Sequence, residues 1–186
     1  MKTFEEVYAT LPGNGWLSED EARLLWLCCQ KTDGAILEVG CYQGRSTVLL
    51  ASFGRTVQCV DPFAGFCTED LDGDKARAAF LANTRQLSNV FIEVCKVEDW
   101  GAFISPHIDL CYLDGDHTYD GTVAQIKKAL ECKPTVIAVH DVNDTGDGAE
   151  VKRAALSMLG PWNLRVGRLA AWGHVLTNLP NGLKEL

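Results

Sequence analysis

The sequence predicts an α/β protein whose sheet is doubly wound, mostly parallel and seven-stranded, and ends in an antiparallel C-terminal hairpin. Short apolar runs alternate with amphipathic stretches along most of the chain, which predicts right-handed crossovers with helices on both faces of a parallel sheet. The last two strand-like runs, 164–169 and 171–177, have almost nothing between them. So short a connection can join only antiparallel neighbours.

The individual helices and strands are predicted from local signals. Ser18, followed by acidic residues at 19–21, marks the start of a helix that ends near Gln30. The apolar run 35–39 is predicted to be a buried strand, and 40–44 a tight turn. Further strands are expected at 56–60, 90–95, 108–113 and 135–139, and further helices at 45–53, 75–87, 118–132 and 148–159.

The length of 186 residues predicts one domain, large enough to bury an apolar core. Within it we expect an N-terminal helical cap (1–33), a core (34–178) and a tail (179–186). The helix at 118–132 is expected to bury one apolar face, and His174 to lie in the final strand. That apolar face consists of Val123, Ile126, Ala129 and Leu130.

Composition excludes several classes of partner. The net charge of −8 and the pI near 4.9 disfavour nucleic acid, because binding to phosphates needs a basic patch. No apolar run approaches the ~20 residues that span a bilayer, and no basic and apolar leader is visible. The eight cysteines contain no C-x-x-C pair and lie mostly in apolar runs, as expected of buried thiols in a reducing compartment. We therefore expect a cytoplasmic protein without a membrane partner.

The residues after the first two strands predict a nucleoside site. Gly40 and Gly44 permit a sharp turn and a close approach of ligand to backbone, and the following helix offers free N–H groups. Asp61, about 21 residues after Gly40, can accept the ribose hydroxyls. A plain strand–turn–helix with a chance acid is the alternative. Tyr42 stands where the dinucleotide fingerprint needs a glycine, which disfavours a nicotinamide cofactor.

Carboxylate and imidazole groups follow the next two strands at the same rim of the sheet. Asp114 follows the fourth strand and Asp141 the fifth, and their oxygens are the ligands that hard divalent cations prefer. His117 is a candidate general base because imidazole titrates near neutral pH. For Asp116 and Thr118 we prefer a capping role at the following helix.

Two stretches carry a resemblance to a known family. ILEVGCYQGRSTVLLA with VQCVDPF, and DGDHTYDG with AVHDV, resemble class I S-adenosylmethionine-dependent methyltransferases, which have a Rossmann-like fold. The most similar group contains catechol O-methyltransferase and the macrocin-type sugar O-methyltransferases. The resemblance implies S-adenosylmethionine as cofactor. The implied cofactor contacts are Glu38, Gly40, Tyr42 and Ser46 at the methionine end, Asp61, Pro62 and Phe63 at the ribose, and Val97 and Glu98 at the adenine. Cys41, Gly44 and Asp114 are further implied contacts.

The same resemblance implies a metal-assisted reaction. Asp114, His140 and Asp141 would hold magnesium or manganese, and His117 would remove the acceptor's proton. This chain departs from the family pattern, because His140 stands where the sugar type has an acid and Val142 where the catechol type has an amide. The implied activity is methylation of a small-molecule or sugar hydroxyl. A nicotinamide-dependent oxidoreductase and a non-catalytic cofactor-binding module are the alternatives.

Two segments are expected to border the substrate. They are residues 1–17, with Trp16, and the loop 64–74, since the chain has few other insertions from which a lid could form. The acceptor cannot be identified from the sequence, and the oligomeric state, including a homo-oligomer, stays open.

Overall fold

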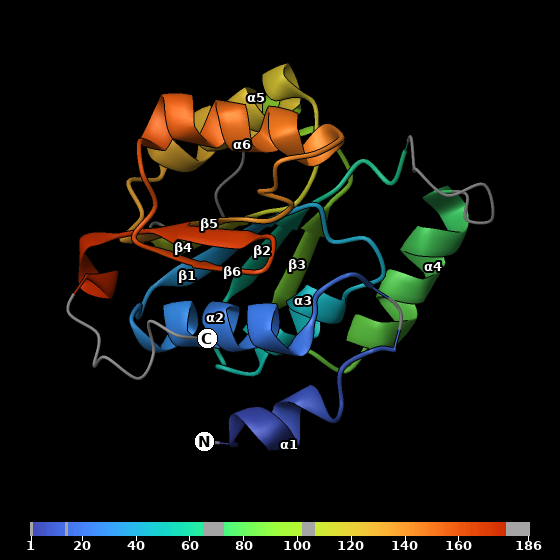
Figure 1. The fold of residues 1–186 in the computed structure, drawn as a ribbon. Helices are drawn as coiled ribbons and strands as arrows, with labels where there is room; N and C mark the ends of the chain where they lie inside the picture. The colour runs from blue at the N-terminus through green and yellow to red at the C-terminus, as the bar shows by residue number, and fades with distance from the viewer. Residues whose placement is uncertain (1, 14, 65–72, 102–106, 178–186) are drawn as a thin grey trace.

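The computed structural model describes residues 2–13, 15–64, 73–101 and 107–177. A seven-stranded sheet lies between two layers of helices (Figure 1). Its strand order is β3-β2-β1-β4-β5-β7-β6. The strands are β1 (Ala35–Val39), β2 (Val57–Val60), β3 (Val90–Glu93), β4 (Ile108–Leu113), β5 (Val136–Val139), β6 (Leu164–Val166) and β7 (Leu169–Trp172).

The pairing of the strands confirms the predicted fold class. β1 pairs in parallel with both β2 and β4, while β7 pairs antiparallel with β5 and β6. The strand order reverses at β1, so its carboxyl end is the switch point at which such sheets bind ligands.

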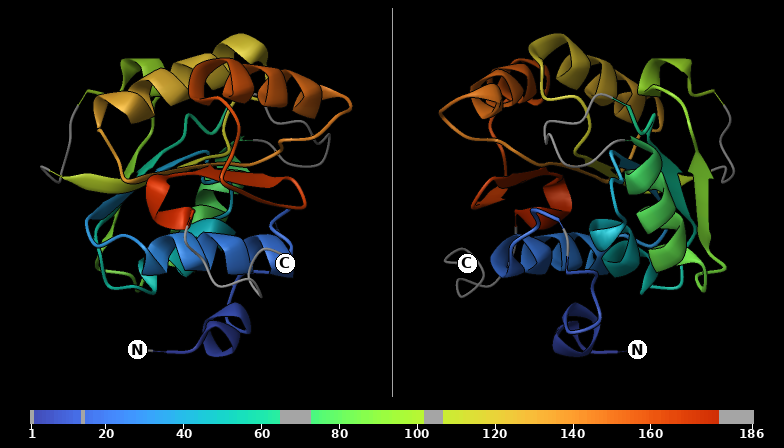
Figure 2. Two further views of the ribbon diagram at one scale, coloured as in Figure 1. Left: turned by 60° about the vertical axis from the view of Figure 1, so that its left-hand side comes forward. Right: turned by 90° about the vertical axis from the view of Figure 1, so that its right-hand side faces the viewer.

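Two apolar cores separate the sheet from its helices. One face packs on the first four helices and the other on the last two, and Figure 2 shows both layers edge-on. Alternate residues of one strand enter different cores, as for Ile36 and Leu37 of β1. The helices are α1 (Phe4–Tyr8), α2 (Glu19–Gln30), α3 (Arg45–Ala51), α4 (Gly73–Thr84), α5 (Tyr119–Glu131) and α6 (Asp147–Leu159), with short 3₁₀ turns η1 (Val97–Asp99) and η2 (His174–Leu176).

The predicted start of α2 is confirmed in detail. The Ser18 side chain accepts a hydrogen bond from the Glu21 N–H, and the Glu21 carboxylate accepts one from the Ser18 N–H. This reciprocal capping box satisfies two of the free donors at the helix start. Glu21 is nevertheless buried, which a cap alone does not require.

Two details of the prediction are wrong. His174 lies in η2, because β7 ends at Trp172, the last residue paired with β5. The hairpin instead turns at Gly167, whose φ of 56° suits glycine. On α5, Leu130 is exposed because the buried face is rotated toward Gly121, Thr122, Gln125, Ile126 and Ala129.

Among the described residues, the longest helices have 13 residues, and none is long and apolar enough to cross a bilayer. The predicted tail and residue 178 lie outside the described residues. The limits of cap, core and tail stay a prediction.

Candidate active site

A cleft of about 670 Å³ opens at the carboxyl ends of the central strands, a size typical of small-molecule sites. It is lined by seven of the predicted cofactor contacts and by all four residues predicted to hold metal or move a proton, with Asp114 in both sets. These ten residues are Gly40, Tyr42, Asp61, Pro62, Val97, Glu98, Asp114, His117, His140 and Asp141.

The backbone at Gly40 lies against the end of β4. The residue has a φ of 83°, and a Cβ placed there would come within 2.2 Å of the Asp114 carbonyl oxygen. The sequence predicted a close approach of ligand to backbone here. The structure shows that a neighbouring stretch of backbone also requires the glycine.

Asp61 holds the two cofactor loops in place. Its Oδ2 accepts hydrogen bonds from the N–H groups of Cys41 (2.7 Å) and Tyr42 (2.9 Å), and its Oδ1 accepts one from Phe63 (2.7 Å). Tyr42 and Phe63 have φ values of 45° and 48°, a left-handed backbone that costs free energy in residues other than glycine. The carboxylate therefore stabilises a strained rim, and one of its roughly four acceptor positions is left for a ligand.

Five of the predicted cofactor contacts lie behind the cleft wall. The Glu38 carboxylate is fully buried and accepts hydrogen bonds from the hydroxyls of Ser46 (2.5 Å) and Thr47 (2.6 Å). Burial raises its pKa to about 7. These five residues support the loop from below and are Glu38, Cys41, Gly44, Ser46 and Phe63.

Replacing Glu38 with glutamine is expected to change how stability depends on pH. Between pH 4.5 and 7 the unfolded chain releases the Glu38 proton while the folded chain retains it. The wild type therefore loses about 3 kcal/mol of unfolding free energy across this window, at 1.36 kcal/mol per pKa unit. Glutamine carries no such titration, so E38Q should gain that amount relative to wild type between pH 4.5 and 8, as measured by urea unfolding. The exposed Glu131→Gln is the control, and parallel pH curves for wild type and E38Q would contradict the interpretation.

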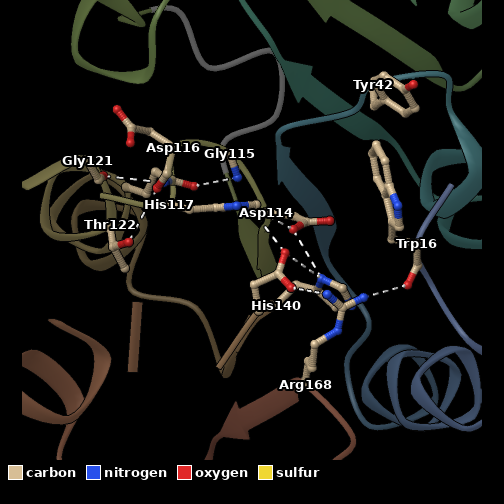
Figure 3. A network of polar contacts seen from close by, with 12 residues as sticks. Trp16, Tyr42, Asp114, Gly115, Asp116, His117, Gly121, Thr122, His140 and Arg168 are labelled. Atoms are coloured by element: carbon tan, nitrogen blue, oxygen red, sulfur yellow. Dashed lines mark hydrogen bonds and ion pairs between the residues drawn. The ribbon is translucent and has the colours of Figure 1, made fainter. Parts of the chain in front are cut away.

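Two carboxylates and two imidazoles form one cluster beyond the carboxyl ends of β4 and β5 (Figure 3). His140 Nδ1 lies 3.2 Å from Asp114 Oδ1 and 3.4 Å from Asp141 Oδ2. His117 Nε2 lies 3.6 Å and 3.4 Å from the same two oxygens. The topology thus brings together all four residues that the sequence predicted for metal binding and proton transfer.

The charges of this cluster shift the pKa of its members. Burial alone would lower the pKa of His140, but the Asp114 carboxylate outweighs it and raises that pKa well above its ordinary value. The pKa of His117 is raised by its close contact with the Asp114 carboxylate, although burial opposes this. Although burial opposes it, the pKa of Asp114 is lowered, chiefly by the charge of His140. In the absence of a cation these contacts therefore favour the protonated imidazoles and the ionised Asp114 carboxylate.

The same geometry fits a divalent cation. Donor atoms of Asp114, His140 and Asp141 all lie within 4.8 Å of one another, and His140 is 2% exposed. Within the described residues, neither ring nitrogen of His140 nor Nε2 of His117 has a hydrogen-bond partner of good geometry. Two carboxylates and an imidazole suit manganese as well as magnesium.

A second cluster of possible donors, Glu38 with Cys41 and Cys59, fits a cation poorly. Burial raises the pKa of Cys59 to about 11 and that of Cys41 well above its ordinary value, so both thiols retain their protons. The carboxylate is already occupied by two hydroxyl donors.

Of the two residues expected to cap the following helix, Thr118 is its N-cap, whereas the Asp116 side chain bonds to Thr118 and not to the helix. Thr118 accepts a hydrogen bond from the Gly121 N–H (3.1 Å) at the start of α5. Asp116 Oδ1 accepts one from the Thr118 N–H (2.8 Å). Both residues nevertheless also line the cleft.

Trp16 lies at the mouth of the cleft, as expected of the 1–17 segment. Its side chain is 56% exposed, and its ring centroid is 5.1 Å from that of Tyr42. Of the other expected lid, 64–74, residues 65–72 lie outside the described residues, while Ala64 lines the cleft.

Sequence reasoning missed two residues that contact the cluster of carboxylates and imidazoles. Glu21 Oε2 lies 3.4 Å from His140 Nε2, and Arg168 Nη1 lies 2.7 Å from Asp141 Oδ1. Burial distinguishes Glu21 from an ordinary acid of a capping box. That burial is not visible in the sequence, so Glu21 could not be singled out there. Arg168 had no signal, because it fell inside a predicted strand.

Comparisons with known proteins agree with this geometry. Residues 37–142, more than half of the chain, match a family model described as "Methyltransferase domain". A comparison with curated proteins finds no match.

Solved structures of similar fold cover most of this chain. CalS11, a TDP-rhamnose 3′-O-methyltransferase of calicheamicin biosynthesis, is 16% identical with a TM-score of 0.59, and the match covers 92% of this chain and 91% of that one. An O-methyltransferase from Bacillus cereus in complex with SAH is 19% identical with a TM-score of 0.58, covering 90% and 89%. The SAH-bound methyltransferase PaMTH1 of Podospora anserina is 15% identical with a TM-score of 0.59, covering 90% and 83%. At these identities the likeness shows the fold alone.

Proposed function

The chain belongs to the methyltransferase-domain family, and we propose that it methylates a hydroxyl oxygen of a small molecule or sugar with the help of a divalent metal ion. Within the family it belongs to the class I, S-adenosylmethionine-dependent group that its sequence resembles. The observation that carries the proposal is the single cleft, in which the Gly40 loop and Asp61 lie beside the cluster of two carboxylates and two imidazoles. Two of the structural neighbours of this chain are described as O-methyltransferases. Their descriptions support oxygen as the atom that accepts the methyl group.

The cofactor would lie across the carboxyl ends of β1 and β2. The Gly40 loop would face its methionine end, and Asp61 would use its remaining acceptor position for a ribose hydroxyl. Val97 and Glu98, which line the far side of the cleft, would flank the adenine.

Asp114, His140 and Asp141 would hold the metal ion, which as a Lewis acid lowers the pKa of the acceptor hydroxyl. His117 Nε2, within 3.6 Å of both carboxylates, takes the hydroxyl proton, and the carboxylates stabilise the imidazolium. The acceptor oxygen would then form a bond to the methyl carbon of S-adenosylmethionine as its carbon–sulfur bond breaks, with S-adenosylhomocysteine as the leaving group. Alignment of the two reactants in one cleft supplies much of the acceleration.

S-Adenosylhomocysteine is expected to raise the melting temperature by about 5–10 °C at ~100 times its Kd, equivalent to about 2.7 kcal/mol. NAD serves as the control, and each titration is repeated with Mn²⁺ and with a chelator. Methyl transfer from labelled S-adenosylmethionine is then measured against catechols and nucleotide sugars. A shift with NAD and none with S-adenosylhomocysteine would contradict the proposal, whereas transfer unaffected by chelator would contradict only its metal component.

A further inference from the structure

The buried carboxylate of Glu21 has no part in the mechanism above, although it lies directly behind His140. It comes from α2, outside the nucleotide-binding part of the sheet, and is only 3% exposed. Its Oε2 is 3.4 Å from His140 Nε2, the ring nitrogen on the side opposite to the Asp114 and Asp141 oxygens. Such an acid is costly to bury unless it is satisfied.

The surrounding chain holds the Glu21 carboxylate in one position. Its Oε2 accepts hydrogen bonds from the Ser18 N–H (2.9 Å) and the Ser18 hydroxyl (2.7 Å), and its Oε1 accepts one from the Arg168 N–H (2.8 Å). Burial opposes it, but the close polar contact with His140, together with these bonds, lowers the pKa of Glu21 to about 2. At Gly167, a Cβ would come within 2.7 Å of Oε1, so the hairpin turn leaves room for this oxygen.

The hairpin turn connects Glu21 to the second metal-site carboxylate. Arg168 donates its backbone N–H to Glu21 and pairs its guanidinium with Asp141 Oδ1, leaving Asp141 Oδ2 toward His140. The Val142 N–H donates to the Arg168 carbonyl (2.8 Å). The rear of the site is therefore one network built from α2, the β6–β7 turn and the loop after β5.

We propose that Glu21 is a positioning residue for His140, a proposal that rests on the metal site of the proposed function. The carboxylate faces the Nε2–H, which fixes the tautomer whose Nδ1 lone pair points at the Asp114 and Asp141 oxygens. Carboxylates behind metal-binding histidines commonly act in this way, and their loss weakens metal affinity about 10- to 100-fold. In this chain the carboxylate does so while also completing the capping box of α2.

The test measures the affinity of Glu21→Gln and Glu21→Asp for Mn²⁺. The EPR signal of the free ion reports how much Mn²⁺ stays unbound. The first variant removes the charge, and the second keeps the charge but withdraws it from His140 by one methylene. Both should bind Mn²⁺ about 10- to 100-fold more weakly, with the affinity for S-adenosylhomocysteine unchanged. Glu19→Gln, on the exposed side of the same helix, is the matched charge control. It should bind Mn²⁺ within about two-fold of wild type.

Folded Glu21 variants with wild-type Mn²⁺ affinity would overturn the positioning role and leave the metal site intact. A wild type that binds no Mn²⁺ would overturn both, while its response to S-adenosylhomocysteine still decides the methyltransferase proposal. If neither Glu21 variant folds, the tautomer is read from ¹⁵N NMR of His140 in Mg²⁺-loaded wild type. The Nε2–H form is expected, and the Nδ1–H form would overturn the proposal.

Discussion

Gly40→Ala is expected to destabilise the protein by more than about 4 kcal/mol, an exceptional cost for one methyl group. The added Cβ would lie 2.2 Å from the Asp114 carbonyl oxygen and 2.4 Å from its carbon, and a φ of 83° is unfavourable for alanine. Neither strand can move aside, because Gly40 donates to Val60 and Asp114 donates to Val39. The melting temperature should fall by about 8–16 °C or more.

Gly13→Ala is the matched control, since its Cβ would meet no atom within 4 Å. Its melting temperature should stay within about 2 °C of wild type. If Gly40→Ala is as stable as Gly13→Ala, the backbone of Gly40 does not lie as close to the Asp114 carbonyl as described.

Asp141→Asn is expected to weaken Mn²⁺ binding by more than about 100-fold, which exceeds the loss caused by removing a residue that only positions a metal ligand. The variant should also lose the metal-stimulated part of methyl transfer. The change deletes one of two anionic donors and keeps the side-chain shape. Asparagine also tolerates the left-handed backbone at this position, where φ is 56°, so the fold should survive. Binding of S-adenosylhomocysteine should be unchanged, because Asp141 is not among the expected cofactor contacts.

Asp144→Asn supplies the control for Asp141→Asn. Asp144 lies three residues further along the chain, is exposed and pairs with Lys152, so its loss changes the net charge equally without touching the cleft. Isothermal titration with Mn²⁺ separates the two variants. Equal affinities in both would place the metal away from Asp141.

The strand pattern was predictable because burial on both faces requires continuous apolar runs. The same reasoning failed after Trp172. Leu176 is buried, as an apolar strand residue would be, but it enters the core from a 3₁₀ turn. Apolar patterning predicts which side chains are buried more reliably than the backbone conformation that buries them.

The front of the candidate site was predictable, and its rear was not. Asp114, His117, His140 and Asp141 directly follow two adjacent strands, so the topology alone places them at one rim. Glu21 and Arg168 meet through a hydrogen bond between residues 147 positions apart. Their contact depends on how the hairpin docks on α2, which no local pattern encodes.

The junction of Glu21 with Arg168 has a consequence for synthesis on the ribosome. Domains are made from the N-terminus at about 5–20 residues per second, so Glu21 leaves the exit tunnel long before the hairpin turn does. A nascent chain ending before residue 168 carries Asp114, His117, His140 and Asp141 yet lacks the arginine that pairs with Asp141 and the backbone donor to Glu21. This site therefore cannot mature before the hairpin turn has been synthesised.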